Sequence, residues 1–182
     1  MNGSISIGPN QQAGNVSTVN GSITLGEAST AASLTTVNGA IRLASSGRIS
    51  GPVSTVNGSI TLERSTDVAG RVSSVNGAIR LHAAHVRGGI KTASHDIDIG
   101  ANSRVEDGIL VQKRTSSWWD RWIRDWFPET DPPPRIVIGP GAVVSGTLKF
   151  ERDVKLYVSD SATIGAVQGA TAIVYSGDQP PG

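Results

Sequence analysis

The sequence VSTVNGSITL at residues 16–25 recurs as LTTVNGAIRL at 34–43, as VSTVNGSITL at 53–62 and as VSSVNGAIRL at 72–81. The chain begins with NGSISI, the second half of the same unit, and a weaker copy, IKTASHDIDI, begins at Ile90. The repeated asparagines follow one another at steps of 18 or 19 residues: Asn20, Asn38, Asn57 and Asn76. A nearly constant step of this size is typical of proteins built from stacked structural repeats.

Inside each unit the apolar residues alternate with polar ones. Ile23 and Leu25 flank Thr24, and the same spacing recurs in the following copies. A period of two is the pattern of a half-buried strand, with one face toward a core and the other toward water. Such a short unit cannot bury its apolar face alone, so the sequence predicts that the units stack on one another.

Two architectures satisfy this pattern. In a parallel β-solenoid each unit is one coil, and Asn-Gly marks a bend between two short strands. In a hairpin, Asn-Gly forms the two-residue turn between antiparallel strands. The solenoid is favoured because identical residues in register lie above one another, about 4.8 Å apart, in successive coils. A meander of hairpins needs alternation but not the same residue in every repeat.

The Asn-Gly pair is expected to be structural. Stacked side-chain amides hydrogen-bond along the stack in cross-β structures, so we predict a structural ladder formed by Asn20, Asn38, Asn57 and Asn76. The glycine after each asparagine is expected to supply the positive φ of the bend, at Gly21, Gly39, Gly58 and Gly77.

Residues 114–134, RTSSWWDRWIRDWFPETDPPP, interrupt the repeats and hold all four tryptophans of the chain. Read as a helix, this segment has an apolar side and a charged side. Pro128 and the prolines at 132–134 would end the helix. The sequence therefore predicts one inserted amphipathic α-helix. Its candidate partner-binding residues are Trp118, Trp119, Trp122, Trp126 and Phe127.

Three interpretations of this helix stay open. It can cover an exposed edge or face of the solenoid, as β-structures require. It can contact another subunit, a protein or a glycan, because tryptophan is enriched at binding hot spots. It can lie in a membrane interface, although the equal numbers of acids and bases on its polar side disfavour membrane contact. The partners that we expect are therefore a second copy of the chain, a protein or a glycan.

The chain is predicted to consist of solenoid repeats over residues 1–113, a Trp-rich helical insertion with a Pro-rich linker over 114–134, further solenoid coils over 135–176, and a tail over 177–182. Short apolar runs resume after the prolines, as in RIVIGPGAVVSGTLKF at residues 135–150. Glycine, proline, serine and aspartate separate these runs, which is typical of strands joined by turns.

Composition excludes several classes of protein. The 182 residues carry a net charge of +1, with 16 basic and 15 acidic side chains, so no electrostatic footprint for nucleic acid is present. The chain has no cysteine, which excludes disulfides and thiol catalysis. No apolar run is long enough for a transmembrane helix, and no signal peptide is visible after Met1.

Residues able to carry chemistry are few. His82 and His85 have a spacing that suits metal binding on a helix, but they follow a strand and have no acidic partner nearby in the sequence. Near His95, the period of two places Asp96 and Asp98 on an outer face. No phosphate loop, G-x-S-x-G or H-E-x-x-H motif occurs. We therefore expect no enzyme, no catalytic residues, no metal site and no cofactor.

The tandem VNGSI and VNGAI units, followed by IVIGPGAVVSGTLKF, DVKLYVSDSATIG and GATAIVYSGD, resemble a bacterial family of exported adhesin-like proteins of unknown function. Members of that family carry repeated T-V-N-G-x-I coils. The resemblance covers nearly the whole chain apart from the Trp-rich segment. It implies a right-handed β-helix in the cell envelope, in the periplasm or on the cell surface, without known catalytic residues.

A weaker resemblance, carried by IGPGAVVSGTL, is to the bactofilins, cytoskeletal β-helices that polymerise end to end. The Asn-Gly repeat departs from their pattern. The sequence thus predicts an all-β, right-handed parallel β-helix (β-solenoid) with coils of about 18–19 residues and one inserted α-helix. The expected function is a non-catalytic, adhesin-like structural module of the cell envelope that binds a partner or a surface. The alternative is a bactofilin-like polymer, and a carbohydrate-binding module is a third.

Overall fold

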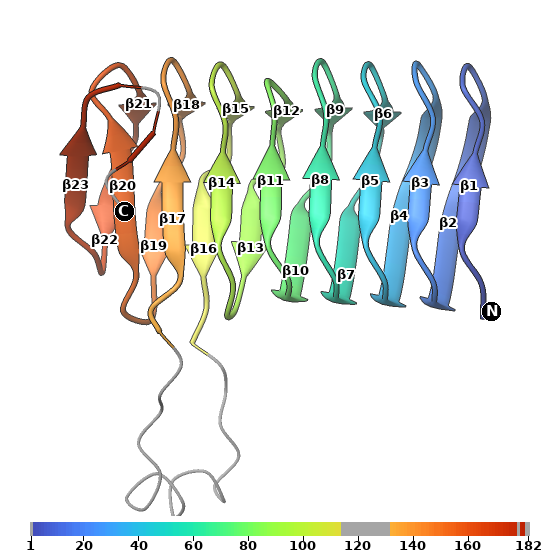
Figure 1. Cartoon of the computed structure of the whole chain (residues 1–182), viewed down its shortest axis with the longest axis horizontal. Coiled ribbons are helices and arrows are strands. Elements are labelled where there is room, and N and C mark those ends of the chain that lie inside the picture. The colour runs from blue at the N-terminus through green and yellow to red at the C-terminus, as the bar shows by residue number, and fades with distance from the viewer. Residues whose placement is uncertain (1, 114–131, 178, 181–182) are drawn as a thin grey trace, which may run out of the picture.

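The computed structural model describes residues 2–113, 132–177 and 179–180. These residues form parallel coils that stack side by side along one axis, with the first coil at one end and the last at the other (Figure 1). Each coil pairs in parallel with the coils before and after it. The prediction of a β-solenoid is confirmed, and the antiparallel hairpin is excluded.

One sheet takes a single strand from every coil. It has nine strands, and its members follow the chain in order: β1 (Ile5–Ile7), β3 (Ile23–Leu25), β5 (Ile41–Leu43), β8 (Ile60–Leu62), β11 (Ile79–Leu81), β14 (Ile97–Ile99), β17 (Arg135–Ile138), β20 (Lys155–Ser159) and β23 (Ala172–Tyr175).

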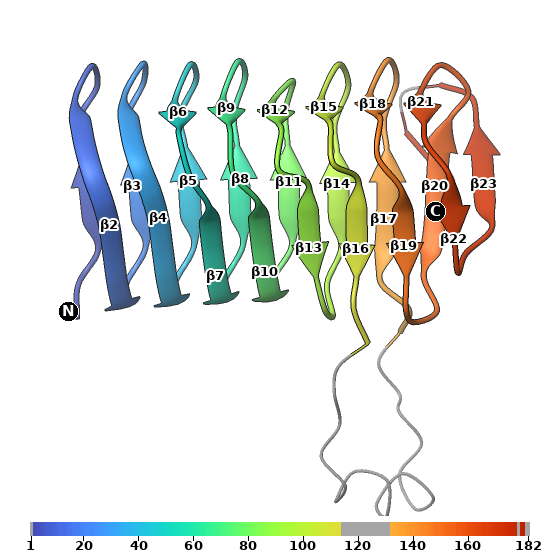
Figure 2. The ribbon, with the colours of Figure 1, turned by 180° about the vertical axis from the view of Figure 1, so that it is seen from behind.

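The other sheet lies behind the first (Figure 2) and begins with two strands of nine residues, β2 (Gln12–Asn20) and β4 (Thr30–Asn38). In later coils this strand is divided in two. The first part gives β6 (Arg48–Ile49), β9 (Asp67–Val68), β12 (His85–Val86), β15 (Arg104–Val105), β18 (Val143–Val144) and β21 (Thr163–Ile164). The second part gives β7 (Val53–Asn57), β10 (Val72–Asn76), β13 (Ile90–Thr92), β16 (Ile109–Val111), β19 (Leu148–Phe150) and β22 (Val167–Gln168).

One additional residue explains this division. Two residues separate Ala31 from Leu34 in β4, whereas the three residues Ser50, Gly51 and Pro52 separate Ile49 from Val53. The longer connection cannot stay in register with β4, and proline has no N–H to give to the ladder. The strand therefore bends at this place, and the following coils inherit the bend.

The core consists of columns of aliphatic side chains in register. Ile41, Ile60 and Ile79 lie above one another, and each is fully buried. Burial of such a side chain contributes about 1.5–3 kcal/mol. The inward and outward positions follow the alternation in the sequence, so the columns explain why every repeat has the same aliphatic residues.

The prediction of an inserted α-helix is wrong for the fold that the structure describes, because the described residues contain strands, turns and bends but no helix. Coils are held by backbone hydrogen bonds between neighbouring coils, whereas a helix satisfies its hydrogen bonds internally and adds no coil. The fold class of the described residues is therefore an all-β solenoid. Residues 114–131, on which that prediction fell, lie outside the described residues.

The expectation that the glycine after each asparagine supplies a positive φ is also wrong. Of the four glycines, only Gly21 has a positive φ, at 153°. A Cβ atom at Gly39 or Gly58 would instead overlap the carbonyl oxygen of the glycine one coil earlier. Glycine is required at these positions because the corners of the coils that carry the asparagines stack too closely for a side chain.

Left-handed backbone occurs at a different corner, in the turns that follow the first six strands of the nine-stranded sheet. One residue per turn has φ between 48° and 62°: Asn10, Ala28, Ser46, Ser65, Ala83 and Asn102. The alanines and serines gave no signal in the sequence, because such residues rarely adopt this conformation.

Candidate functional site

The asparagines lie in one row at the corner that follows β2, β4, β7 and β10. Each Nδ2 donates to the Oδ1 of the asparagine one coil earlier, over 2.8–3.0 Å, along the series Asn2, Asn20, Asn38, Asn57 and Asn76. The hydroxyl of Ser94 donates to Oδ1 of Asn76 over 3.0 Å and ends the row. These contacts make a chain of amide hydrogen bonds along one edge of the solenoid.

A second row of hydrogen bonds lies inside the same corner. The hydroxyl two residues before each asparagine is buried and donates to a glycine carbonyl one coil earlier, over 3.0–3.1 Å. The pairs are Thr18 with Gly3, Thr36 with Gly21, Thr55 with Gly39, and Ser74 with Gly58. Sequence reasoning missed this row, although the recurring Thr or Ser two residues before asparagine is its signal.

The residue between each hydroxyl and its asparagine is an exposed valine. Val19, Val37, Val56 and Val75 are 45%, 37%, 38% and 42% exposed, and they form the valine row. Strand pairing keeps these residues in register from coil to coil. The ladder face, defined as the valine row together with the adjoining asparagines, therefore repeats the same apolar and amide groups at every coil.

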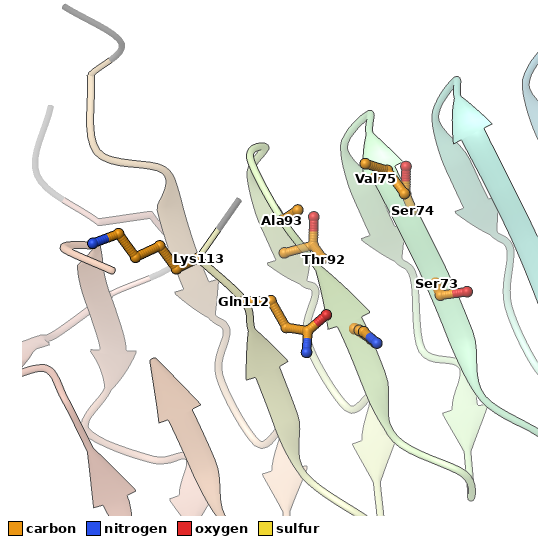
Figure 3. A pocket seen from close by; sticks show the side chains of 8 residues that line it. Ser73, Ser74, Val75, Thr92, Ala93, Gln112 and Lys113 are labelled. Atoms are coloured by element: carbon orange, nitrogen blue, oxygen red, sulfur yellow. The ribbon is translucent and has the colours of Figure 1, made fainter. Parts of the chain in front are cut away.

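A hollow of about 420 Å³ lies where the valine row ends. Figure 3 shows Val75 on one side of it, Thr92 and Ala93 between, and Gln112 and Lys113 on the other side. Ala93 occupies the position that valine holds in the preceding coils, and its smaller side chain leaves the space.

The electrostatics of this hollow are basic. Lys91 and Lys113 line it, and none of the carboxylates in the described part of the chain does. Thr92 is 1% exposed, and its Oγ1 has no hydrogen-bond partner among the described residues. The hollow thus offers positive charge and an unsatisfied hydroxyl beside an apolar row.

The two histidines with metal-like spacing do not act together. His85 contacts carboxylates from other coils, with Nε2 2.8 Å from Oε1 of Glu106 and Nδ1 3.5 Å from Oδ1 of Asp67. Sequence reasoning missed both partners because they lie about one coil away along the chain, while His82 borders a different hollow. In the part of the chain that the structure describes, no group of His, Asp and Glu side chains could hold a metal ion.

The two carboxylates near His95 that were expected on the outer face, those of Asp96 and Asp98, lie beside residues of neighbouring coils. Asp96 accepts a hydrogen bond from the backbone N–H of Arg135 over 2.8 Å, and Asp98 lies beside Arg80 in the adjacent strand of the nine-stranded sheet.

The candidate residues Trp118, Trp119, Trp122, Trp126 and Phe127 lie outside the described residues. Within residues 2–113, 132–177 and 179–180, no helix is long and apolar enough to span a membrane.

The fold and its ladders define the protein as a parallel β-solenoid, a repeat protein held by hydrogen bonds between coils. Comparisons with protein-family models, with curated proteins and with solved structures gave no match to this chain. Its function has to be argued from its own faces and ends.

Proposed function

We propose that the protein is a non-catalytic structural module of the bacterial cell envelope that binds a partner or a surface through the ladder face. The observation that carries this proposal is the valine row. Exposed apolar residues are ordinary when scattered, but an ordered patch of them is typical of an interaction surface. The resemblance to exported adhesin-like proteins adds the envelope location.

The ladder face suits binding for a physical reason. Its valine side chains are short and β-branched, and its asparagine side chains are hydrogen-bonded to one another through their amide groups. Little conformational entropy is therefore lost when a partner binds. Lys91 and Lys113 at the end of the row favour a partner that carries acidic groups. A protein or glycan with an apolar face and acidic substituents meets both requirements.

The experiment compares the protein with the double variant Val37→Ser/Val56→Ser in sedimentation with purified envelope fractions. The matched control is Thr35→Ser/Ser54→Thr on the same strands, β4 and β7. We expect the control to bind like the unchanged protein and the valine variant to bind about tenfold more weakly, the equivalent of about 1.4 kcal/mol. Their melting temperatures should stay equal. No binding by the unchanged protein, or equal binding by the valine variant, would contradict the proposal.

A second candidate function, an end-to-end polymer, is favoured by the two ends of the stack. Within the residues that the structure describes, β1 and β23 each pair on one side only. Residues 2–20 of the first coil contain no charged side chain, and Ile173 and Val174 of the last strand are 45% and 66% exposed. Natural proteins commonly protect such strand edges with charges, so these ends favour stacking of copies.

Light scattering over a concentration series, with electron microscopy of the same samples, separates the two functions. A polymer gives linear particles that lengthen with concentration, and Val174→Lys should prevent their growth, whereas Thr171→Lys before the strand should not. A monomer or a fixed small oligomer at every concentration excludes the polymer and leaves the binding module.

A further inference from the structure

One turn of the stack is shorter than its neighbours. The turn from Leu81 to Val86 has one residue fewer than the turns that connect Leu62 to Val68 and Ile99 to Val105. Figure 1 shows that the turn before β12 stands lower than the turns beside it. The step of 18 residues from Asn76 to Ser94, after two steps of 19, reflects this shorter turn in the sequence.

The short turn lacks hydrogen bonds that the longer turns have. In those turns a backbone N–H closes the turn, as from Thr66 to the carbonyl of Glu63 over 3.2 Å. Successive turns are also joined, as from the N–H of Ser65 to the carbonyl of Ala83 over 3.0 Å. No such backbone bond runs from the N–H of Ala83 to the following turn within the described residues. The regular stack of turns is therefore interrupted at Ala83.

A hollow of about 630 Å³ lies at this interruption. We call it the notch. Its lining includes Arg48, Thr66, Asp67, Ala83, His85 and Arg104, which come from four successive coils. A hollow of about 590 Å³ borders the other side of the same turn and shares Ala83 with it. The missing residue thus leaves space that the other turns fill.

The Oγ1 atom of Thr66, a residue only 1% exposed, lies at the wall of the notch and has no hydrogen-bond partner among the described residues. Leaving such an atom unpaired is unfavourable. A hydroxyl group of a ligand can pair with it, because a hydroxyl donates and accepts.

The charges around the notch follow the strand register. Arg48, Asp67, His85 and Arg104 occupy one row across β6, β9, β12 and β15. Asp67 is paired with Arg87 over 2.6 Å, and Glu106 is paired with His85 over 2.8 Å.

The guanidinium groups at the two ends of this row are less well paired. Arg48 has no ion pair among the described residues, and Nε of Arg104 lies 3.6 Å from Glu106. Guanidinium groups bind carboxylate and phosphate oxygens with two parallel hydrogen bonds. Both ends of the notch can therefore bind an anion.

We propose that the notch binds an anionic sugar unit, with Arg48 contacting its acidic group and Thr66 contacting a hydroxyl. The acidic group is a carboxylate or a phosphate. The notch shares no residue with the ladder face, so this proposal stands independently of the proposed function. A surface ion-pair network alone explains neither the short turn nor the unpaired hydroxyl.

Binding is measured by titration of the ¹⁵N-labelled protein with glucuronate, glucose 6-phosphate and glucose. We expect at least one acidic sugar to shift the amide signals of Thr66, Asp67, Ala83 and Arg104, with glucose about tenfold weaker. A preference for glucuronate identifies the carboxylate, and a preference for glucose 6-phosphate identifies the phosphate. Equal binding of glucose, or no shifts at millimolar sugar, overturns the proposal.

Two variants locate the site. Arg48→Gln should weaken the preferred sugar about tenfold, as loss of a charge-assisted hydrogen bond does, whereas Arg80→Gln on the opposite sheet should not. Insertion of one serine between Ala83 and Ala84 restores the turn length and should abolish binding. If the insertion fails to fold, the Arg48 and Arg80 variants still decide. Unchanged affinity in Arg48→Gln, or in a folded insertion variant, overturns the proposal.

Discussion

The coils up to Asn76 and the coils after Ile90 have the same interior but different corners. Ile79, Ile97 and Ile136 continue one fully buried column across the boundary. The asparagine row, by contrast, ends at Ser94, and His95 stands where the earlier coils have glycine. The aliphatic columns are therefore sufficient to add a coil, and the corner ladders are an additional source of stability.

The difference also shows where the molecule is open. The hollow beside Ala93 lies where the valine row stops, and the notch lies where one turn loses a residue. The buried hydroxyls of Thr66 and Thr92, which have no hydrogen-bond partner among the described residues, lie at these two places. Departures from the repeat mark the two hollows, whereas the ladder face follows the repeat itself.

The largest effect is expected from Ile60→Asp, which tests the part that both regions share. Ile60 is fully buried in the middle of its column, and an unpaired buried charge is not tolerated. We expect a loss of at least about 3 kcal/mol or failure to fold, measured by urea unfolding. Val56→Asp, four residues earlier on the exposed face, should change stability by about 0.5 kcal/mol. Unchanged stability in Ile60→Asp would contradict the in-register core.

A smaller effect is expected from Gly58→Ala, which tests the corner of the first region. The new Cβ would overlap the carbonyl oxygen of Gly39, and overpacking of this kind costs about 1–3 kcal/mol. Gly14→Ala is the control, because nothing lies within 4 Å of its Cβ position. Thermal unfolding should show destabilisation for Gly58→Ala only. If both variants melt alike, close stacking is not the reason for glycine.

The smallest effect is expected from the pair Thr55→Val and Thr92→Val, which compares the two regions directly. The hydroxyl of Thr55 donates to Gly39 over 3.0 Å, so its removal should cost about 1 kcal/mol. The hydroxyl of Thr92 has no partner among the described residues, so its removal should be neutral or stabilising. Equal losses in chemical denaturation would show that the inner ladder continues past Asn76.

The repeat made the architecture predictable, but it did not predict the sites. Identical residues at nearly constant steps favoured stacked coils over hairpins, and alternation assigned Ile23 and Leu25 to the interior. The carboxylate partners of His85 were missed because local spacing does not reveal residues one coil away. The inserted helix, inferred from an apolar pattern and from the prolines that would end it, has no counterpart in the described residues, and residues 114–131 lie outside them.

The sequence by itself determined the stacking, the strand period and the register of the coils, because these follow from which side chains repeat and how far apart they lie. Only the tertiary structure decided why glycine follows asparagine, which turn leaves a notch and which charges meet beside it. These features depend on contacts between neighbouring coils, where one residue more or fewer in a turn changes which atoms touch. The order of residues along the chain determines the repeat, and the packing between neighbouring coils determines what each departure from the repeat does to the structure.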